Sequence, residues 1–111
     1  MNMQHRELAS GKWNELKFVE QMANVGSEVE RAINWRKKNN PGYSQLAFDR
    51  ALELLDLTLG DKKSFPCLRE LARLREALAD YFVFDNIYNS TDEKWHNYFF
   101  AFNHAARMAR N

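Results

Sequence analysis

Residues 12–59 read KWNELKFVEQMANVGSEVERAINWRKKNNPGYSQLAFDRALELLDLTL, and this stretch decides the fold. On either side of Asn39-Asn40-Pro41-Gly42, apolar residues recur every three or four positions, which is the spacing of one face of an α-helix. The tetrapeptide consists of residues that end helices and form turns. The stretch therefore predicts two helices, over residues 12–38 and 44–59, joined by a short turn. Gly26 lies in the apolar sector of the first helix, where we expect a neighbouring helix to pack closely, although glycine costs a helix about 1 kcal/mol relative to alanine.

The helical spacing continues in the second half of the chain. Ser64 and Pro66 are typical of a helix start, so we expect a third helix from this point to Phe84. Ser90-Thr91-Asp92-Glu93 fits the S-x-x-E capping box and predicts a fourth helix that reaches Ala109. Short connections favour antiparallel neighbours. The sequence therefore predicts an all-α protein, an up-down-up-down antiparallel four-helix bundle.

Length and composition limit the class of protein. The chain has 111 residues, 45% of them hydrophobic, with only four Gly and two Pro, which fits one domain with long regular elements. We expect residues 11–111 to form a single helical bundle domain and residues 1–10 to form an N-terminal tail or a helix extension. The 16 Lys and Arg nearly balance the 15 Asp and Glu, so neither a nucleic acid nor a membrane surface is a favoured partner.

The lone cysteine, Cys67, has no second cysteine to pair with, which favours a reducing compartment. The first residues lack the apolar core of a signal peptide, and no apolar run approaches the length needed to cross a membrane. We therefore expect a cytoplasmic location.

A set of polar residues interrupts the apolar faces. Arg75 falls in the middle of the apolar sector of the third helix, where a buried guanidinium needs an acidic partner. Glu30 lies in the wide apolar sector of the first helix, while Asp56 and Asn103 lie at sector edges. In an alternating bundle these four residues form a polar layer. It is either a buried ion pair that fixes helix register or a ligand pocket in which Arg75 binds a carboxylate or phosphate and Glu30 and Asp56 orient it.

A second anomaly is that the outward faces of the helices carry some apolar residues. The chain has 14% aromatic residues, and some of its apolar residues lie off the main stripes. They are either scattered exposed side chains, which are common, or an interface with a second copy or a protein partner. Trp13 and Trp35, off the main stripe of the first helix, fit such packing. The candidate interface residues are Phe100, His96, His104, Arg107, Leu46 and Leu57.

Motifs for catalysis are incomplete. Glu93-x-x-His96 has the spacing of di-metal helical bundles, but it occurs once, and a di-metal site needs two copies. Glu53-x-x-Asp56 is similar to the carboxylate motif of all-α nucleotide pyrophosphohydrolases, without the preceding E-x-x-E. The glycines form no phosphate-binding loop. The sequence therefore predicts no catalytic residue, no metal and no cofactor.

Four strings, over residues 23–32, 51–58, 73–82 and 98–107, resemble a family of short prokaryotic all-helical proteins. This resemblance implies the fold and the compartment only. In size and architecture the chain is more loosely similar to the helical partners of minimal nucleotidyltransferases and to the related HEPN ribonucleases. The arginine and histidine signature of those ribonucleases is absent from this sequence.

Together these patterns favour a non-catalytic helical interaction module, expected to be a homodimer. The alternative is a small-ligand or nucleotide-binding accessory protein with a polar pocket inside the bundle. A third hypothesis, magnesium-dependent nucleotide hydrolysis, rests on Glu53 and Asp56 alone.

Overall fold

The computed structural model describes residues 11–61 and 63–110. Within these ranges the chain contains helices and no strand, so the all-α prediction is confirmed. The prediction for residues 1–10 lies outside the described part. The elements are η1 (Lys12–Glu15), α2 (Phe18–Lys37), α3 (Pro41–Leu59), α4 (Phe65–Phe82) and α5 (Asp92–Arg110).

The first predicted helix is two elements, so its start at Lys12 is wrong. After the 3-10 turn of η1 the backbone is extended at Leu16 and Lys17, and α2 begins at Phe18. The Lys17 N–H donates to Glu20 Oε1 at 3.3 Å, which caps the new helix start. The break allows Trp13 to turn inward, where it is only 1% exposed.

The α3 helix starts three residues earlier than predicted. Asn40 is its N-cap, with a side-chain oxygen that accepts from the Tyr43 N–H at 3.0 Å, and Pro41 occupies the first turn, where its missing N–H is not needed. Ser44, the predicted start, is instead buried within the helix and donates its hydroxyl to the Ala32 carbonyl at 2.8 Å. This bond ties α3 to α2 next to their connection.

Of the two capping residues predicted for the last two helices, Ser64 is confirmed and Ser90 is wrong. Ser64 caps α4, accepting from the Cys67 N–H at 3.4 Å, as expected. The capping hydroxyl of α5 belongs to Thr91, which accepts from the Lys94 N–H at 3.1 Å, and not to Ser90. The Ser90 carbonyl and N–H are both bonded to the side chain of Asn86 in the preceding loop.

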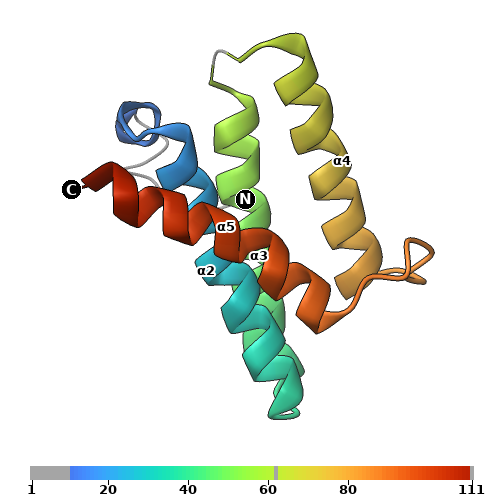
Figure 1. Ribbon diagram of the computed structural model, residues 1–111. Helices are drawn as coiled ribbons and strands as arrows, with labels where there is room; N and C mark the ends of the chain where they lie inside the picture. Colours follow the sequence, from blue (N-terminus) through green and yellow to red (C-terminus); the bar gives the residue numbers. More distant parts are fainter. Residues whose placement is uncertain (1–10, 62, 111) are drawn as a thin grey trace.

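Figure 1 shows the arrangement of the helices. α2 and α3 run antiparallel along one another, and α4 lies beside α3. α5 crosses obliquely over the α2–α3 pair and packs mainly on α2, so the up-down-up-down order is not confirmed. α4 therefore stands at the edge of the molecule with one side uncovered.

The crossing of α2 and α5 explains the glycine in α2. A Cβ built on Gly26 would lie 2.8 Å from the Cβ of Phe99, closer than carbon atoms pack. The close approach expected at Gly26 is thus present, and the neighbour is α5.

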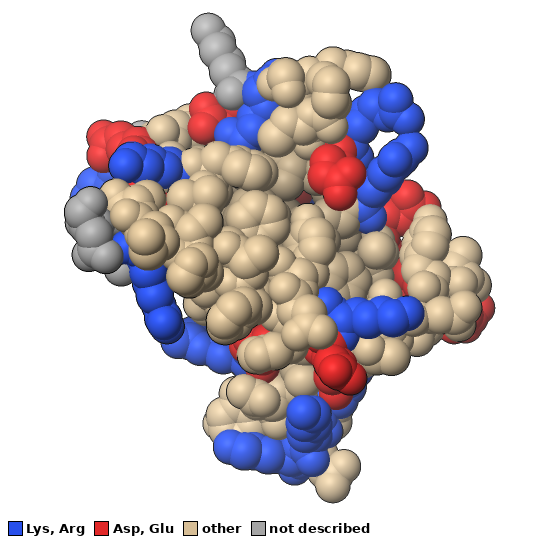
Figure 2. Space-filling model, viewed as in Figure 1, with Lys and Arg blue, Asp and Glu red and all other residues tan. Residues whose placement is uncertain are grey.

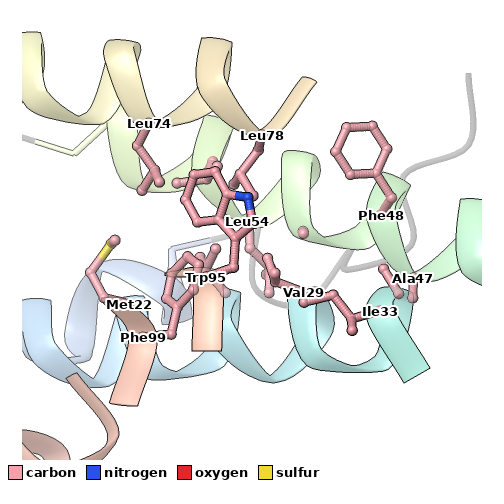
Figure 3. Packing of buried hydrophobic residues seen from close by; sticks show 14 of the residues in the cluster. Met22, Val29, Ile33, Ala47, Phe48, Leu54, Leu74, Leu78, Trp95 and Phe99 are labelled. Atoms are coloured by element: carbon pink, nitrogen blue, oxygen red, sulfur yellow. The ribbon is translucent and has the colours of Figure 1, made fainter. Parts of the chain in front are cut away.

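The core is one cluster to which all the helices contribute. Figure 3 shows Trp95 of α5 projecting toward Leu74 and Leu78 of α4, while Phe99 lies near Met22 of α2. Large aromatic side chains contribute much of the buried apolar area in a core of this size. Trp95 of α5 also lies near Tyr81 of α4, with the ring centres 6.4 Å apart.

A polar contact joins three helices near one end of the core. Arg36 of α2 places its guanidinium 4.5 Å from the ring centre of Tyr81 and 4.6 Å from that of Phe82, both in α4. The same guanidinium lies 3.4 Å from Asp92 of α5, and the Tyr81 hydroxyl donates to Asp92. Burial, together with this bond to a carboxylate, raises the pKa of Tyr81 to about 12.

This raised pKa predicts a loss of stability at alkaline pH. Between about pH 10 and pH 12 the unfolded chain loses the Tyr81 proton while the folded chain keeps it, so unfolding becomes more favourable as pH rises through this window. We expect the free energy of unfolding to fall more steeply with pH in the wild type than in Tyr81→Phe, measured by urea denaturation at pH 9 to 12. Parallel pH profiles for the two proteins would contradict this.

Candidate functional site

The loop between α4 and α5 is held by a buried carboxylate. Asp80, in the last turn of α4, is 6% exposed, and its two oxygens accept from the backbone N–H groups of Ile87 at 2.9 Å and Tyr88 at 3.1 Å. Asn86 adopts the left-handed backbone conformation, with φ of 54°, and its side chain bonds to Ser90 through both its amide and its carbonyl. The loop is therefore fixed by hydrogen bonds along most of its length.

This fixed loop displays large apolar side chains to solvent. We call Val83, Phe84, Ile87 and Tyr88 the loop patch. Their exposed fractions are 52%, 71%, 72% and 52%. The loop projects from the molecule in Figure 1, and in Figure 2 the same region forms a largely uncharged knob with acidic side chains around it. Adjacent exposed apolar side chains of this size are typical of interaction surfaces.

A groove of about 470 Å³ lies between the loop patch and the outer side of α4. Its lining combines small side chains of the helix with charged residues and with apolar residues of the loop. The residues that form it include Ala72, Arg75, Glu76, Ala79, Phe84 and Ile87.

Arg75 and Glu76, two of the charged groups of the groove, are bonded to neighbouring side chains. Arg75 makes two bonds to the carboxylate of Asp56 on α3, from Nε at 2.8 Å and from Nη2 at 3.4 Å. The Tyr88 hydroxyl donates to Glu76 Oε1 at 3.2 Å, and this bond raises the pKa of the exposed tyrosine. The Tyr88 side chain is thereby held across the outer side of α4.

Removing the carboxylate of Asp80 should release the loop. In Asp80→Ala the N–H groups of Ile87 and Tyr88 lose their acceptor, and we expect the free energy of unfolding to fall by about 1–3 kcal/mol. Amide hydrogen exchange at these two residues should become much faster than in the wild type. Substitution of Asp85, an exposed carboxylate in the same loop, by Ala is the matched control and should leave exchange at both amides unchanged.

The predicted buried polar layer is not formed. Arg75 and Asp56 do meet, but their side chains are 40% and 52% exposed, so this ion pair lies at the surface between α3 and α4. Glu30 instead lies 2.9 Å from His96 Nδ1, between α2 and α5. Asn103 lines a separate hollow of about 160 Å³ along α2 and α5. The helical wheel placed Arg75 inward because it assumed neighbours on both sides of α4, and one side is open.

The buried carboxylate of α2 is Glu28, which the sequence analysis did not single out. It is 8% exposed and bonds to Arg31 at 3.1 Å and to Arg50 of α3 at 3.1 Å. Because α3 covers this side of α2, the acidic residue that turns inward is two positions before Glu30.

The predicted interface residues fall in different places. On α5, Phe100 is 60% exposed with the His96 ring 6.2 Å away, His104 is exposed, and Arg107 lines the hollow that contains Asn103. On α3, Leu46 is 46% exposed, whereas Leu57 packs against the core. The outward placement of Leu57 is therefore wrong.

The two tryptophans assigned to an outer surface also differ. Trp13 is part of the core, where its Nε1 donates to Thr58 Oγ1 at 2.9 Å. Trp35 is partly buried, with the Tyr43 ring centre 4.8 Å away.

Sequence reasoning did not single out the loop patch. Ile87 and Tyr88 follow no helical or strand period, so no pattern marked them. The available signal was Asp85-Asn86, which correctly suggests a helix end, since α4 stops at Phe82 and not at the predicted Phe84.

In the ranges 11–61 and 63–110, no group of three or more His, Cys, Asp or Glu is placed to hold a metal ion. No helix in the same ranges is long and apolar enough to cross a membrane. No protein-family model, curated protein or solved structure matches the chain.

Proposed function

We propose that this chain is a non-catalytic helical interaction module that assembles as a homodimer. The observation that carries the proposal is the loop patch, in which Phe84 and Ile87 are more than two-thirds exposed on a loop held by Asp80. A surface that is already ordered loses little conformational entropy when a partner binds, so such a surface is suited to association.

Two surfaces are available for this role. One is the loop patch with the outer side of α4. The other is the sequence-predicted surface on α5, where Phe100 and Met108 are 60% and 61% exposed. The first has the larger number of adjacent exposed apolar side chains and a groove beside them, so we favour it.

The alternative is a small-ligand or nucleotide-binding accessory protein. The groove of about 470 Å³ supports this alternative, since it has the size of a ligand site and includes Arg75. Against it, two of the guanidinium nitrogens already bond to Asp56, so an anion has to compete with a carboxylate of the same chain.

The hypothesis includes a cytoplasmic location and a relationship to other small helical proteins. A cytoplasmic location agrees with the single cysteine. The resemblance to short prokaryotic all-helical proteins, and the looser similarity to helical partners of nucleotidyltransferases, are compatible with an assembly role.

Native mass spectrometry of the purified full chain tests the proposal. A dimer with no added mass is the expected result, and Ile87→Asp should reduce the dimer fraction because it places a charge in the loop patch. A monomer, with or without a bound small molecule, would contradict the homodimer. A reproducible added mass on that monomer would favour the ligand-binding alternative.

A further inference from the structure

The uncovered side of α4 carries a regular stripe. α4 makes its main helix contact with α3, and no helix of the described chain covers the opposite side, which the Tyr88 side chain reaches at Glu76. Along that side, residues recur at intervals of four and three, which is the spacing of helices that pair along their length. We call this stripe the outer seam: Phe65, Arg69, Ala72, Glu76, Ala79 and Val83. Each of these residues is exposed or partly exposed.

The shape of the outer seam suits another helix. Ala72 and Ala79 are small, so a partner helix can approach closely between them. Phe65 projects at one end with 71% exposure, and the groove beside Ala79 lies toward the other end. The seam therefore has an aromatic side chain at one end and a hollow for such a side chain near the other.

The two arginines on this side lie in the first half of α4, where Glu70 lies beside them. Neither Arg69 nor Arg73 makes an ion pair with any residue in the described ranges. Glu76 lies in the second half, and Asp85 follows in the loop. The nearby Arg75 is already paired with Asp56, so it brings no unpaired charge.

The outer seam of one copy matches the outer seam of a second copy that runs in the opposite direction. Phe65 and Val83, Arg69 and Ala79, and Ala72 and Glu76 are each equally distant from position 74. Two antiparallel copies centred at this position thus place Phe65 of one beside Val83 and the groove of the other. The same register places Arg73 of one copy opposite position 75 of the other, one residue from Glu76, so the long Arg73 side chain can reach the Glu76 carboxylate.

We propose that α4 pairs antiparallel with α4 of a second copy of this chain, about a two-fold axis near position 74. Phe65 of each copy then fills the groove beside Ala79, Phe84 and Ile87 of the other. This is a self-complementary contact of the kind that closes a symmetric dimer. The inference rests on the proposed homodimer and assigns its interface.

A charge-exchange experiment tests the pairing. Sedimentation equilibrium of the full chain should show that Arg73→Glu and Glu76→Arg each weaken the dimer about tenfold or more, because each puts like charges together. The double variant Arg73→Glu/Glu76→Arg should restore the wild-type dissociation constant. An equimolar mixture of the two single variants should form a heterodimer, since one α4 is then acidic and the other basic.

Three further variants test whether the contact depends on the outer seam. Ala72→Glu places a charge in the centre of the seam and should abolish the dimer, while Ala101→Glu changes an exposed alanine on α5 and should keep the dimer. Phe100→Glu should also keep it, with circular dichroism confirming that every variant folds.

The possible failures are distinguishable. A wild-type dimer that persists in Ala72→Glu, or that Phe100→Glu breaks, overturns the α4 pairing and leaves the homodimer proposal standing. A wild-type chain that is monomeric at all concentrations overturns both. Loss of the dimer in both single variants without recovery in the double variant also overturns the antiparallel register.

Discussion

Replacing Gly26 by alanine should lower the free energy of unfolding by about 1–3 kcal/mol, although alanine favours a helix more than glycine does. The new Cβ would lie 2.8 Å from the Cβ of Phe99 and 2.9 Å from two of its ring carbons. Since one of these atoms is the Cβ itself, no rotation of the Phe99 side chain removes the contact. α2 and α5 must move apart, and urea denaturation followed by circular dichroism at 222 nm should show the loss.

Gly42→Ala is the matched control. Gly42 is also helical, and the nearest atom to its added Cβ is Asn40 Oδ1 at 3.7 Å, an ordinary contact distance. This substitution should be neutral or slightly stabilising. Gly26→Val should cost more than Gly26→Ala, because a branched side chain needs a larger separation of the two helices. If Gly26→Ala unfolds at the same urea concentration as the wild type, α5 does not cross α2 at this residue.

Trp13→Ala should cost about 3–5 kcal/mol, the range for removing a fully buried large aromatic side chain. The indole is 1% exposed and lies against the core beneath the 3-10 turn. Its Nε1 donates to Thr58 Oγ1, and the Trp13 carbonyl accepts from Gln21 Nε2 at 2.9 Å. The substitution therefore removes packing and the donor to the Thr58 hydroxyl, which keeps its own bond to the Leu54 carbonyl.

Two other tryptophan variants separate these contributions. Trp13→Phe retains much of the apolar area and loses the bond to Thr58, so we expect a smaller loss, of about 1–2 kcal/mol. Trp35→Ala removes a side chain that is only partly buried and should cost less than Trp13→Ala. An equal loss in Trp13→Ala and Trp35→Ala would contradict the assignment of Trp13 to the core.

The parts of the fold that were predictable from sequence depend on local spacing. The four amphipathic stretches, the cap at Ser64 and the tight packing at Gly26 all follow from residues within one helix. The break before α2 was not predictable in this way, because its cause is the contact of Trp13 with Thr58, which is 45 residues away. A helical wheel treats Trp13 as one more residue of a continuous helix.

The candidate site was less predictable for a related reason. Arg75 was expected to find an acidic partner, and Asp56 is that partner. The prediction that Arg75 is buried was wrong. Burial at this position depends on whether a second helix covers α4, and a single sequence does not show this. The loop patch depends on the Asp80 side chain reaching backbone groups seven and eight positions later, and such a bond leaves no periodic signal.

The crossing of α2 and α5 also bears on how the chain is made. Phe99 and Gly26 pack together although most of the sequence lies between them. In contrast, α2 and α3 are joined by a short turn and can pair as soon as both have emerged from the ribosome. Closing the longer separation costs more chain entropy, so α5 docking should be a late folding event. Until α5 is synthesised, the apolar side of α2 that it covers stays accessible to other nascent chains and to chaperones. Slow translation of residues 83–110 would prolong that exposure.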